Sequence, residues 1–170
     1  LARSGDALKD ANITNAATAG SRSFDVAAPT GLKIDRDGGL HFLGYSGNRS
    51  LIIFNIFAQA LDGLHDYSKI TGAASAGAVC ERGLIAARVE LPQADTGAWS
   101  YYSLGGAESN LNYHKELVEF MFRICENSAE ATFCDLHARL AGYLTTKPTV
   151  TGISKKVKGG RIYVTFRLSK

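Results

Sequence analysis

Three cysteines are the residues whose chemistry depends most directly on spacing. Eight residues separate Cys125, at the end of one predicted helix, from Cys134, at the start of the next. A reversal between these helices would bring the two Cα atoms within the roughly 4.4 to 6.8 Å that a disulfide needs. Two buried thiols on apolar helix faces are the alternative. Cys80 is then the odd cysteine, which in a secreted chain is free or joins another chain, so it is a candidate for an interchain disulfide.

Catalytic and metal-binding motifs are weak in this sequence. The four histidines, which could each supply a general base, are not placed beside a nucleophile or a second acid; they are His41, His65, His114 and His137. The order His114-Lys115-Glu116 is that of zinc deaminases, but no Pro-Cys-x-x-Cys follows it. Cys125, Cys134 and His137 lack a fourth ligand and the short spacing of zinc sites. The sequence therefore predicts no metal site, no cofactor and no catalysis.

Basic residues are concentrated at the C-terminal end. Residues 147–170 contain seven basic and no acidic residues, whereas the chain as a whole has a net charge of only +3. We predict that an anionic surface or partner binds at the tip of a hairpin that carries Lys155, Lys156, Lys158 and Arg161. The alternative is that these charges only prevent the hairpin from pairing with other sheets.

Three aromatic side chains are candidates for binding sugars, and two asparagines are candidates for glycosylation. Trp99, Tyr101 and Tyr102 are candidates for stacking on sugar rings, although they would serve equally well as core residues. Asn12 and Asn48 each begin an Asn-x-Ser/Thr triplet and are candidate glycosylation sites of a secreted glycoprotein.

Composition indicates a soluble globular domain. The chain has 170 residues, of which 45% are hydrophobic and 21% charged. Its longest apolar stretch, residues 51–61, is too short to span a bilayer, which takes about 20 residues. Residues 1–31 lack Met and clear periodicity, and we expect a flexible arm or precursor remnant there. Residues 32–170 are expected to form one domain.

The first half of that domain should alternate strands and helix. Residues 40–45 predict a strand, and apolar spacing predicts a helix to about residue 67. The small residues 71–80 fit either a helix or a loop. Alternating apolar residues at 85–91 predict a strand, which residues 98–104 would pair with as a hairpin.

The second half should contain two helices and a final hairpin. A helix follows Ser109, with His114 facing water. Asn127 and Glu130 have the spacing of a capping box that begins a second helix, ending near residue 143. Residues 149–154 and 161–168 predict two strands. Together these elements predict a two-layer α/β sandwich of the split βαβ, ferredoxin-like kind, with a mainly antiparallel sheet and helices on one face.

The segment from Cys125 to Cys134 also carries a family resemblance. Its Cys-Glu, small residue, aromatic and second Cys resemble a segment in the C-terminal subunit of secreted yeast killer toxins. The resemblance implies a structural bridge between the two cysteines and a second subunit cut from the same precursor. It also implies a secreted antifungal protein that binds cell-wall polysaccharide and then perturbs the membrane.

We therefore expect a secreted, non-enzymatic, killer toxin-like protein that binds the cell wall or an anionic membrane surface. Two alternatives stay open. One is a nucleic-acid-binding or viral coat-like protein, whose binding would weaken steeply with salt. The other is a small secreted hydrolase that uses a histidine and an acid not recognisable from spacing.

Overall fold

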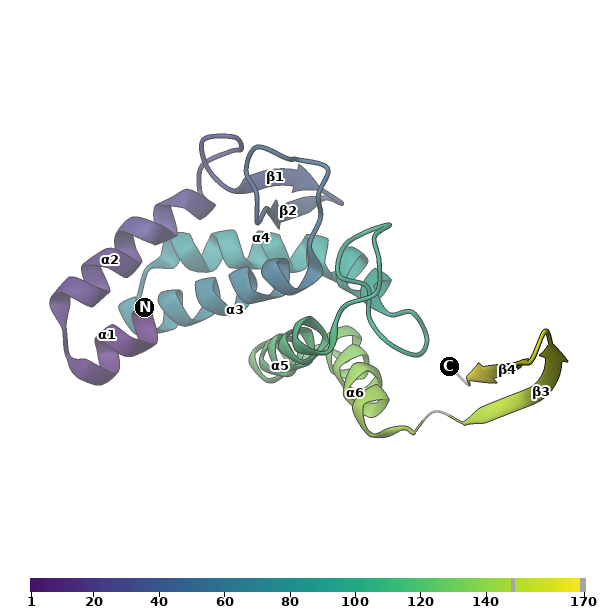
Figure 1. The fold of residues 1–170 in the computed structure, drawn as a ribbon. Helices are drawn as coiled ribbons and strands as arrows, with labels where there is room; N and C mark the ends of the chain where they lie inside the picture. Colours follow the sequence, from purple (N-terminus) through teal and green to yellow (C-terminus); the bar gives the residue numbers. More distant parts are fainter. Residues whose placement is uncertain (148, 169–170) are drawn as a thin grey trace.

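Helices form the body of the protein. The computed structural model describes residues 1–147 and 149–168. Four helices dominate it: α3 (Phe54–Thr71), α4 (Ala74–Glu90), α5 (Leu111–Ser128) and α6 (Ala131–Thr145). As Figure 1 shows, α3 and α4 run side by side, and α5 and α6 cross below them. The helix expected after residue 50 is confirmed, although it begins at Phe54.

The core lies where these helices meet. The large, fully buried side chains come from three of them, namely Phe57 and Leu61 from α3, Leu117 and Met121 from α5, and Phe133, Leu136 and Leu140 from α6. These positions recur at helical spacing, so each helix turns one apolar stripe inward. Burial of a large apolar side chain of this kind stabilises a fold by about 1.5 to 3 kcal/mol.

Helix α4 replaces the strand expected at residues 85–91, so that prediction is wrong. Its buried residues include Cys80, Leu84 and Ala87, which recur at helical spacing. The larger side chains at residues 85–91 alternate in the sequence and therefore indicated a strand instead. Gly83 explains the close packing, because a Cβ atom there would lie 2.5 Å from Cδ2 of Leu61. Small residues thus let α4 approach α3 closely. This packing stabilises the helix although its glycines have low helix propensity.

A short hairpin covers one end of the α3 and α4 pair. Strand β1 (Lys33–Arg36) pairs antiparallel with β2 (Gly39–Phe42). Asp37 and Gly38 both have positive φ, as a tight hairpin turn requires. All of β2 is buried, and the strand predicted at residues 40–45 is confirmed only for its first half, because β2 ends at Phe42.

The N-terminal segment contains regular structure. Helices α1 (Ala2–Leu8) and α2 (Ala11–Ser21) precede a short 3-10 helix, η1 (Arg22–Phe24). Arg3 of α1 pairs with Asp62, at 3.0 Å, and with Asp66, both in α3. The Tyr67 hydroxyl of α3 donates to Thr18 Oγ1 at 3.0 Å. Helices α1 and α2 therefore pack on α3, where we expected a flexible arm.

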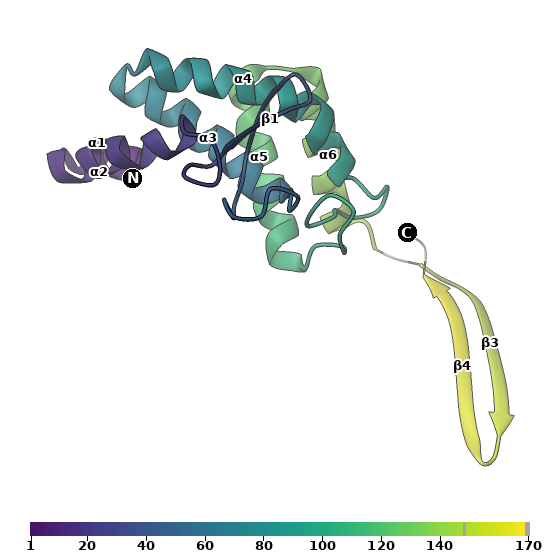
Figure 2. The ribbon, with the colours of Figure 1, turned by 90° about the horizontal axis from the view of Figure 1, so that it is seen from above.

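The second hairpin stands apart from the body in both views (Figures 1 and 2). Strand β3 (Val150–Lys158) pairs antiparallel with β4 (Arg161–Leu168), as the sequence predicts. Every side chain from Val150 to Arg167 is exposed.

The expected combination of helix and strand is present, but the sandwich is not confirmed. The strands of the described residues form two separate two-stranded sheets, and neither is the central sheet of a two-layer fold. Residues 98–104, predicted as a strand, form a loop with isolated bridges. This loop follows the 3-10 helix η2 (Leu91–Ala94). No described helix is long and apolar enough to cross a membrane.

Candidate active site

Tyrosines from separate segments meet beside the first turns of α5. Tyr102 lies in the loop after η2, and Tyr113 lies in α5. Their ring centroids are 4.8 Å apart, with the ring planes tilted by 45°. Tyr45, in the loop after β2, is close enough to influence Tyr102 electrostatically. We call Tyr45, Tyr102, Tyr113 and Glu116 the tyrosine cluster.

The surroundings of Tyr102 favour its protonated form. Partial burial raises the pKa of the Tyr102 phenol, and the negative charges that Tyr113, Tyr45 and Glu116 can carry add to this effect. The phenol therefore keeps its proton at neutral pH and is present as a hydrogen-bond or proton donor.

A buried amide fixes the carboxylate of the cluster. Asn55, in the first turn of α3, donates from Nδ2 to Oε2 of Glu116 at 3.0 Å. Asn55 is only 6% exposed, and its Oδ1 atom has no hydrogen-bond partner in the described part of the chain. The glutamate itself is exposed on α5. A fixed but accessible carboxylate is a suitable proton acceptor.

Backbone hydrogen bonds hold the loop of Tyr102 against the start of α3. The Phe54 amide donates to the Tyr102 carbonyl at 3.2 Å, and the Leu104 amide donates to the Ile52 carbonyl at 2.9 Å. These two hydrogen bonds tie Tyr102 to the segment that carries Asn55.

A buried histidine holds the same loop to α5. The His114 ring stacks on Trp99, with centroids 3.7 Å apart. Its Nε2 donates to the Leu140 carbonyl at 3.0 Å, which leaves Nδ1 to accept from the Ser100 hydroxyl at 2.8 Å. Burial lowers the pKa of His114, in agreement with this neutral form. The prediction that His114 faces water is wrong, because its neighbour on the helix stripe is the core residue Leu117.

Asp95 anchors the loop to α6. Its Oδ2 accepts from Arg139 Nε at 2.8 Å, and its Oδ1 accepts from the Gly97 amide at 2.8 Å and the Tyr143 hydroxyl at 2.9 Å. Burial alone would raise the pKa of Asp95, but these donors outweigh it and the pKa is lowered. Asp95 is consequently an ionised structural anchor.

The aromatic trio predicted for sugar stacking is divided by the structure. Trp99 is part of the packing around His114, and its Nε1 donates to the Ser109 carbonyl at 2.8 Å. Tyr101 is 37% exposed, whereas Tyr102 belongs to the tyrosine cluster. Contact of these side chains with sugar stays a prediction.

Sequence reasoning missed Tyr45, Asn55, Tyr113 and Glu116. Their segments are far apart in the chain, so no spacing connects them. Two weak signals were present: a polar Asn55 inside an apolar run, and Asp95-Thr96-Gly97, which has the composition of a turn.

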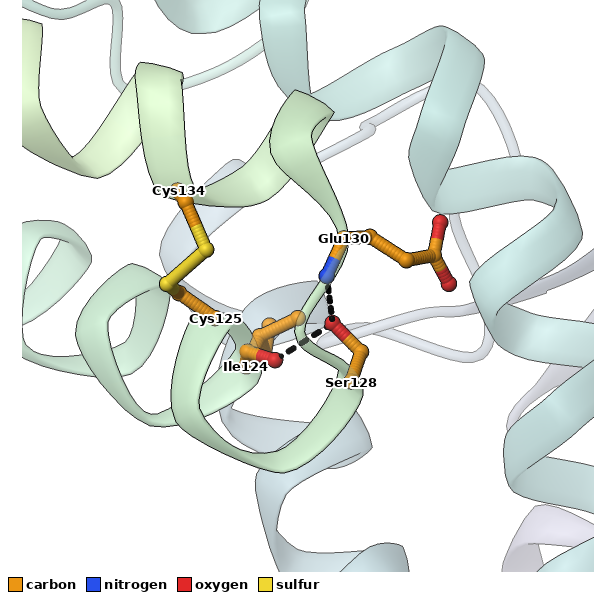
Figure 3. The surroundings of a disulfide bond; sticks show 5 residues. All are labelled: Ile124, Cys125, Ser128, Glu130 and Cys134. Carbon is orange, nitrogen blue, oxygen red and sulfur yellow. Dashed lines mark hydrogen bonds between the residues drawn. A yellow bond between two sulfur atoms is a disulfide. The ribbon is translucent and has the colours of Figure 1, made fainter.

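A disulfide joins the helices α5 and α6 (Figure 3). Cys125 and Cys134 are bonded, with their Cα atoms 4.8 Å apart, in agreement with the expected bridge. The turn between them is secured by the Ser128 hydroxyl, which donates to Ile124 and accepts from the Glu130 amide. Glu130 is the N-cap residue of α6, so the predicted capping box at Asn127 is wrong: Asn127 still lies within α5.

Cys80 does not fit the interchain role expected for it. The residue is 4% exposed, and its Sγ donates to the Leu61 carbonyl at 3.5 Å. Burial raises the pKa of its thiol to about 12. A bridge to another chain needs an accessible sulfur, which this position does not provide.

The remaining predicted sites are all on the surface. Lys155, Lys156, Lys158 and Arg161 are exposed on the β3–β4 hairpin, and Lys170, which was included in the basic end, lies outside the described residues. Asn12 and Asn48 are exposed, and their glycosylation stays a prediction.

Two buried acids, Glu90 and Asp62, do not form an open histidine–acid pair. His41 pairs with Glu90 at 2.8 Å, but these side chains are 0% and 1% exposed. Burial raises the pKa of Asp62, yet this carboxylate is already paired with Arg3 and Arg123. Neither acid is thus available with a histidine at an open surface.

Comparison with known families places the chain among carbohydrate-modifying enzymes. The matching family model is the D-glucuronyl C5-epimerase C-terminus, and the match spans residues 1–142. Since this is most of the chain, the protein belongs to that family. No curated protein sequence matches it.

The family overturns the functional predictions from the sequence. The resemblance to killer toxins is wrong, and so is the expectation of a non-enzymatic, antifungal, membrane-perturbing protein. The family gives no support to the alternative of a nucleic-acid-binding or coat-like protein. The killer-toxin motif was only a short interval between two cysteines, which any bridged helical turn can share.

Proposed function

We propose that this chain performs the proton transfers of C5 epimerisation on D-glucuronyl residues, with the tyrosine cluster as its acid–base site. The family supplies the reaction class. The observation that carries the assignment of residues is the contact of Tyr102 with Tyr113 beside a carboxylate fixed by Asn55.

The reaction needs one acid and one base on opposite faces of the sugar. The C5 hydrogen of a glucuronyl residue is adjacent to the carboxylate, so a base removes it as a proton and leaves the electron pair delocalised into the carboxylate. A proton delivered to the other face inverts C5 and gives the L-iduronyl epimer. One proton leaves and one returns, so no oxidant or reductant is consumed.

Tyr102 is the proposed acid in the direction from D-glucuronyl to L-iduronyl. Its environment holds the proton on the phenol, which is the state an acid must have before it acts. The base lies on α5, where Tyr113 and Glu116 are neighbours at i and i+3. Glu116 takes the C5 proton directly or through the Tyr113 phenol, and Asn55 positions the carboxylate.

The setting proposed for this activity is the lumen of the secretory pathway or the extracellular space. The family is typical of the secretory pathway. The disulfide between Cys125 and Cys134 supports an oxidising compartment. The exposed sequons at Asn12 and Asn48 are compatible with it.

Substitution of the tyrosines tests the assignment. In a Tyr102→Phe variant we expect the formation of L-iduronyl residues from a D-glucuronyl oligosaccharide to fall by about 10²- to 10⁴-fold, since one general acid is removed. Tyr101→Phe is the matched control, because the neighbouring phenol is outside the cluster. Glu116→Gln and Tyr113→Phe distinguish direct from relayed proton removal. Equal activity in Tyr102→Phe and the wild type would refute the assignment.

A further inference from the structure

We propose that the cationic face of the β3–β4 hairpin binds an acidic polysaccharide chain that contains the glucuronyl residues to be modified. This inference rests on the proposed function for the identity of the polymer. It assigns a second carbohydrate contact, which lies beyond residues 1–142 that match the family.

The strand register separates the hairpin into two chemically different faces. Directly opposite residues share a face, and Lys156 lies opposite Tyr163 while Lys158 lies opposite Arg161. Because side chains alternate along a strand, Val157 and Ile162 lie together on the other face, opposite each other. We call the first set, Lys156, Lys158, Arg161 and Tyr163, the cationic face.

The cationic face is fully available to a ligand. Its side chains are exposed, and Tyr163 is 50% exposed. Within residues 1–147 and 149–168, none of its three cations takes part in an ion pair; every ion pair of the described chain lies in the helical body and the β1–β2 hairpin. These cations are therefore not neutralised by the protein itself.

The partner that fits this face is a polymer with repeated carboxylates. Lys156 and Lys158 are two positions apart on one side of a strand, which spaces their charges by about 7 Å. Arg161 adds a third charge beside Lys158, and the Tyr163 ring offers an apolar surface for a sugar face. A glucuronyl polymer supplies both features, an anionic group on its uronate residues and sugar rings between them. A hairpin that holds the chain would raise the local concentration of substrate at the tyrosine cluster.

Binding of defined polymers to the complete 170-residue chain tests the inference. The ligands are polyglucuronate and, as a neutral control, dextran; binding is measured at low and at high salt. We expect the wild type to bind polyglucuronate more weakly at high salt than at low salt, and not to bind dextran. The variant Lys156→Gln/Lys158→Gln/Arg161→Gln should bind polyglucuronate about tenfold more weakly, as the loss of a few exposed ion pairs implies.

Two control variants make the result specific. Lys9→Gln/Arg22→Gln/Lys69→Gln removes the same charge from exposed positions of the body and should bind like the wild type. Tyr102→Phe should also retain polymer binding, because its defect is in proton transfer; its failure on oligosaccharides tests the proposed function separately. Unchanged polyglucuronate binding in the hairpin variant would overturn the inference and leave the epimerase assignment intact. Binding of duplex DNA as tight as that of polyglucuronate would also overturn the inference, because it would show that the cationic face does not prefer carbohydrate.

Discussion

The helical body and the β3–β4 hairpin are built on opposite principles. In the body, helices α3 to α6 enclose fully buried side chains such as Phe57 and Phe133. In the hairpin, apolar residues such as Ile162 and Phe166 are 61% and 51% exposed. An isolated two-stranded hairpin is marginally stable in water, because it has no buried face. Stability and the candidate active site thus belong to the body, and the hairpin is free to serve as a binding surface.

Truncation of matched phenylalanines should show the largest difference between the two regions. Phe133→Ala leaves a cavity in the core and should lower the free energy of unfolding by about 3 to 5 kcal/mol. Phe166→Ala removes an exposed ring and should change it by less than about 0.5 kcal/mol. Urea unfolding followed by circular dichroism measures both. Similar losses in the two variants would mean that the hairpin is folded onto the body.

Removal of the disulfide should have the next largest effect, and only on the body. Cys125→Ser/Cys134→Ser opens a loop with a sequence separation of nine residues. Loop entropy then predicts a loss of about 2 to 3 kcal/mol in the free energy of unfolding. Cys80→Ser is a control that leaves the bridge in place. A double variant as stable as the wild type would show that the α5–α6 turn is held by Ser128 and Glu130 alone.

We expect the free energy of unfolding of the helical body to depend on pH through the ionisation of Asp95. Its folded-state pKa is lowered, so its stabilising contribution is complete above the ordinary carboxyl pKa of about 3.9 and is lost as the pH falls through the folded value. Asp95→Asn should cost about 1 to 2 kcal/mol at neutral pH, a modest value because Arg139 is half exposed. The variant should also lose less stability than the wild type on acidification.

The exposed pair of Asp35 and Arg82 provides the control for that experiment, since Asp35 is 89% exposed. Asp35→Asn removes an exposed ion pair and should change the free energy of unfolding at neutral pH by less than about 0.5 kcal/mol. If acidification destabilised Asp95→Asn as much as the wild type, Asp95 would not be the titrating anchor.

Deletion of the hairpin should have the smallest effect on the body. A chain that ends at residue 147 loses side chains that are exposed wherever their burial is described, from residue 149 to 167, so its melting temperature should remain within about 1 to 2 °C of the full chain. Differential scanning calorimetry makes this comparison. A large decrease in the melting temperature would place part of the core under the hairpin.

The sequence predicted local elements better than their assembly. Strong periodicity correctly indicated α3, α5 and the β3–β4 strands, because each pattern is decided within one segment. Helix α4 was missed because its packing depends on small residues such as Gly83 facing Leu61, a contact that only tertiary structure creates. The arm at residues 1–31 was misjudged for the same reason, since Arg3 finds its partners in α3.

The candidate site was less predictable than the fold. Tyr102 was singled out, but as a stacking residue, and its partners come from segments that the loop contacts bring together. The sequence predicts a surface position for His114, yet it is the buried residue that holds the Tyr102 loop. A site assembled from three segments leaves no fixed spacing for a single sequence to reveal.

Proton exchange at C5 tests the central claim most directly. A D-glucuronyl oligosaccharide is incubated with the protein in D₂O, and deuterium at C5 is followed by NMR together with inversion. The wild type should incorporate deuterium and invert C5. Tyr102→Phe should still exchange from the side of the exposed Glu116 carboxylate but should invert little. Absence of C5 exchange in the wild type, or normal inversion in Tyr102→Phe, would contradict the assignment of the tyrosine cluster.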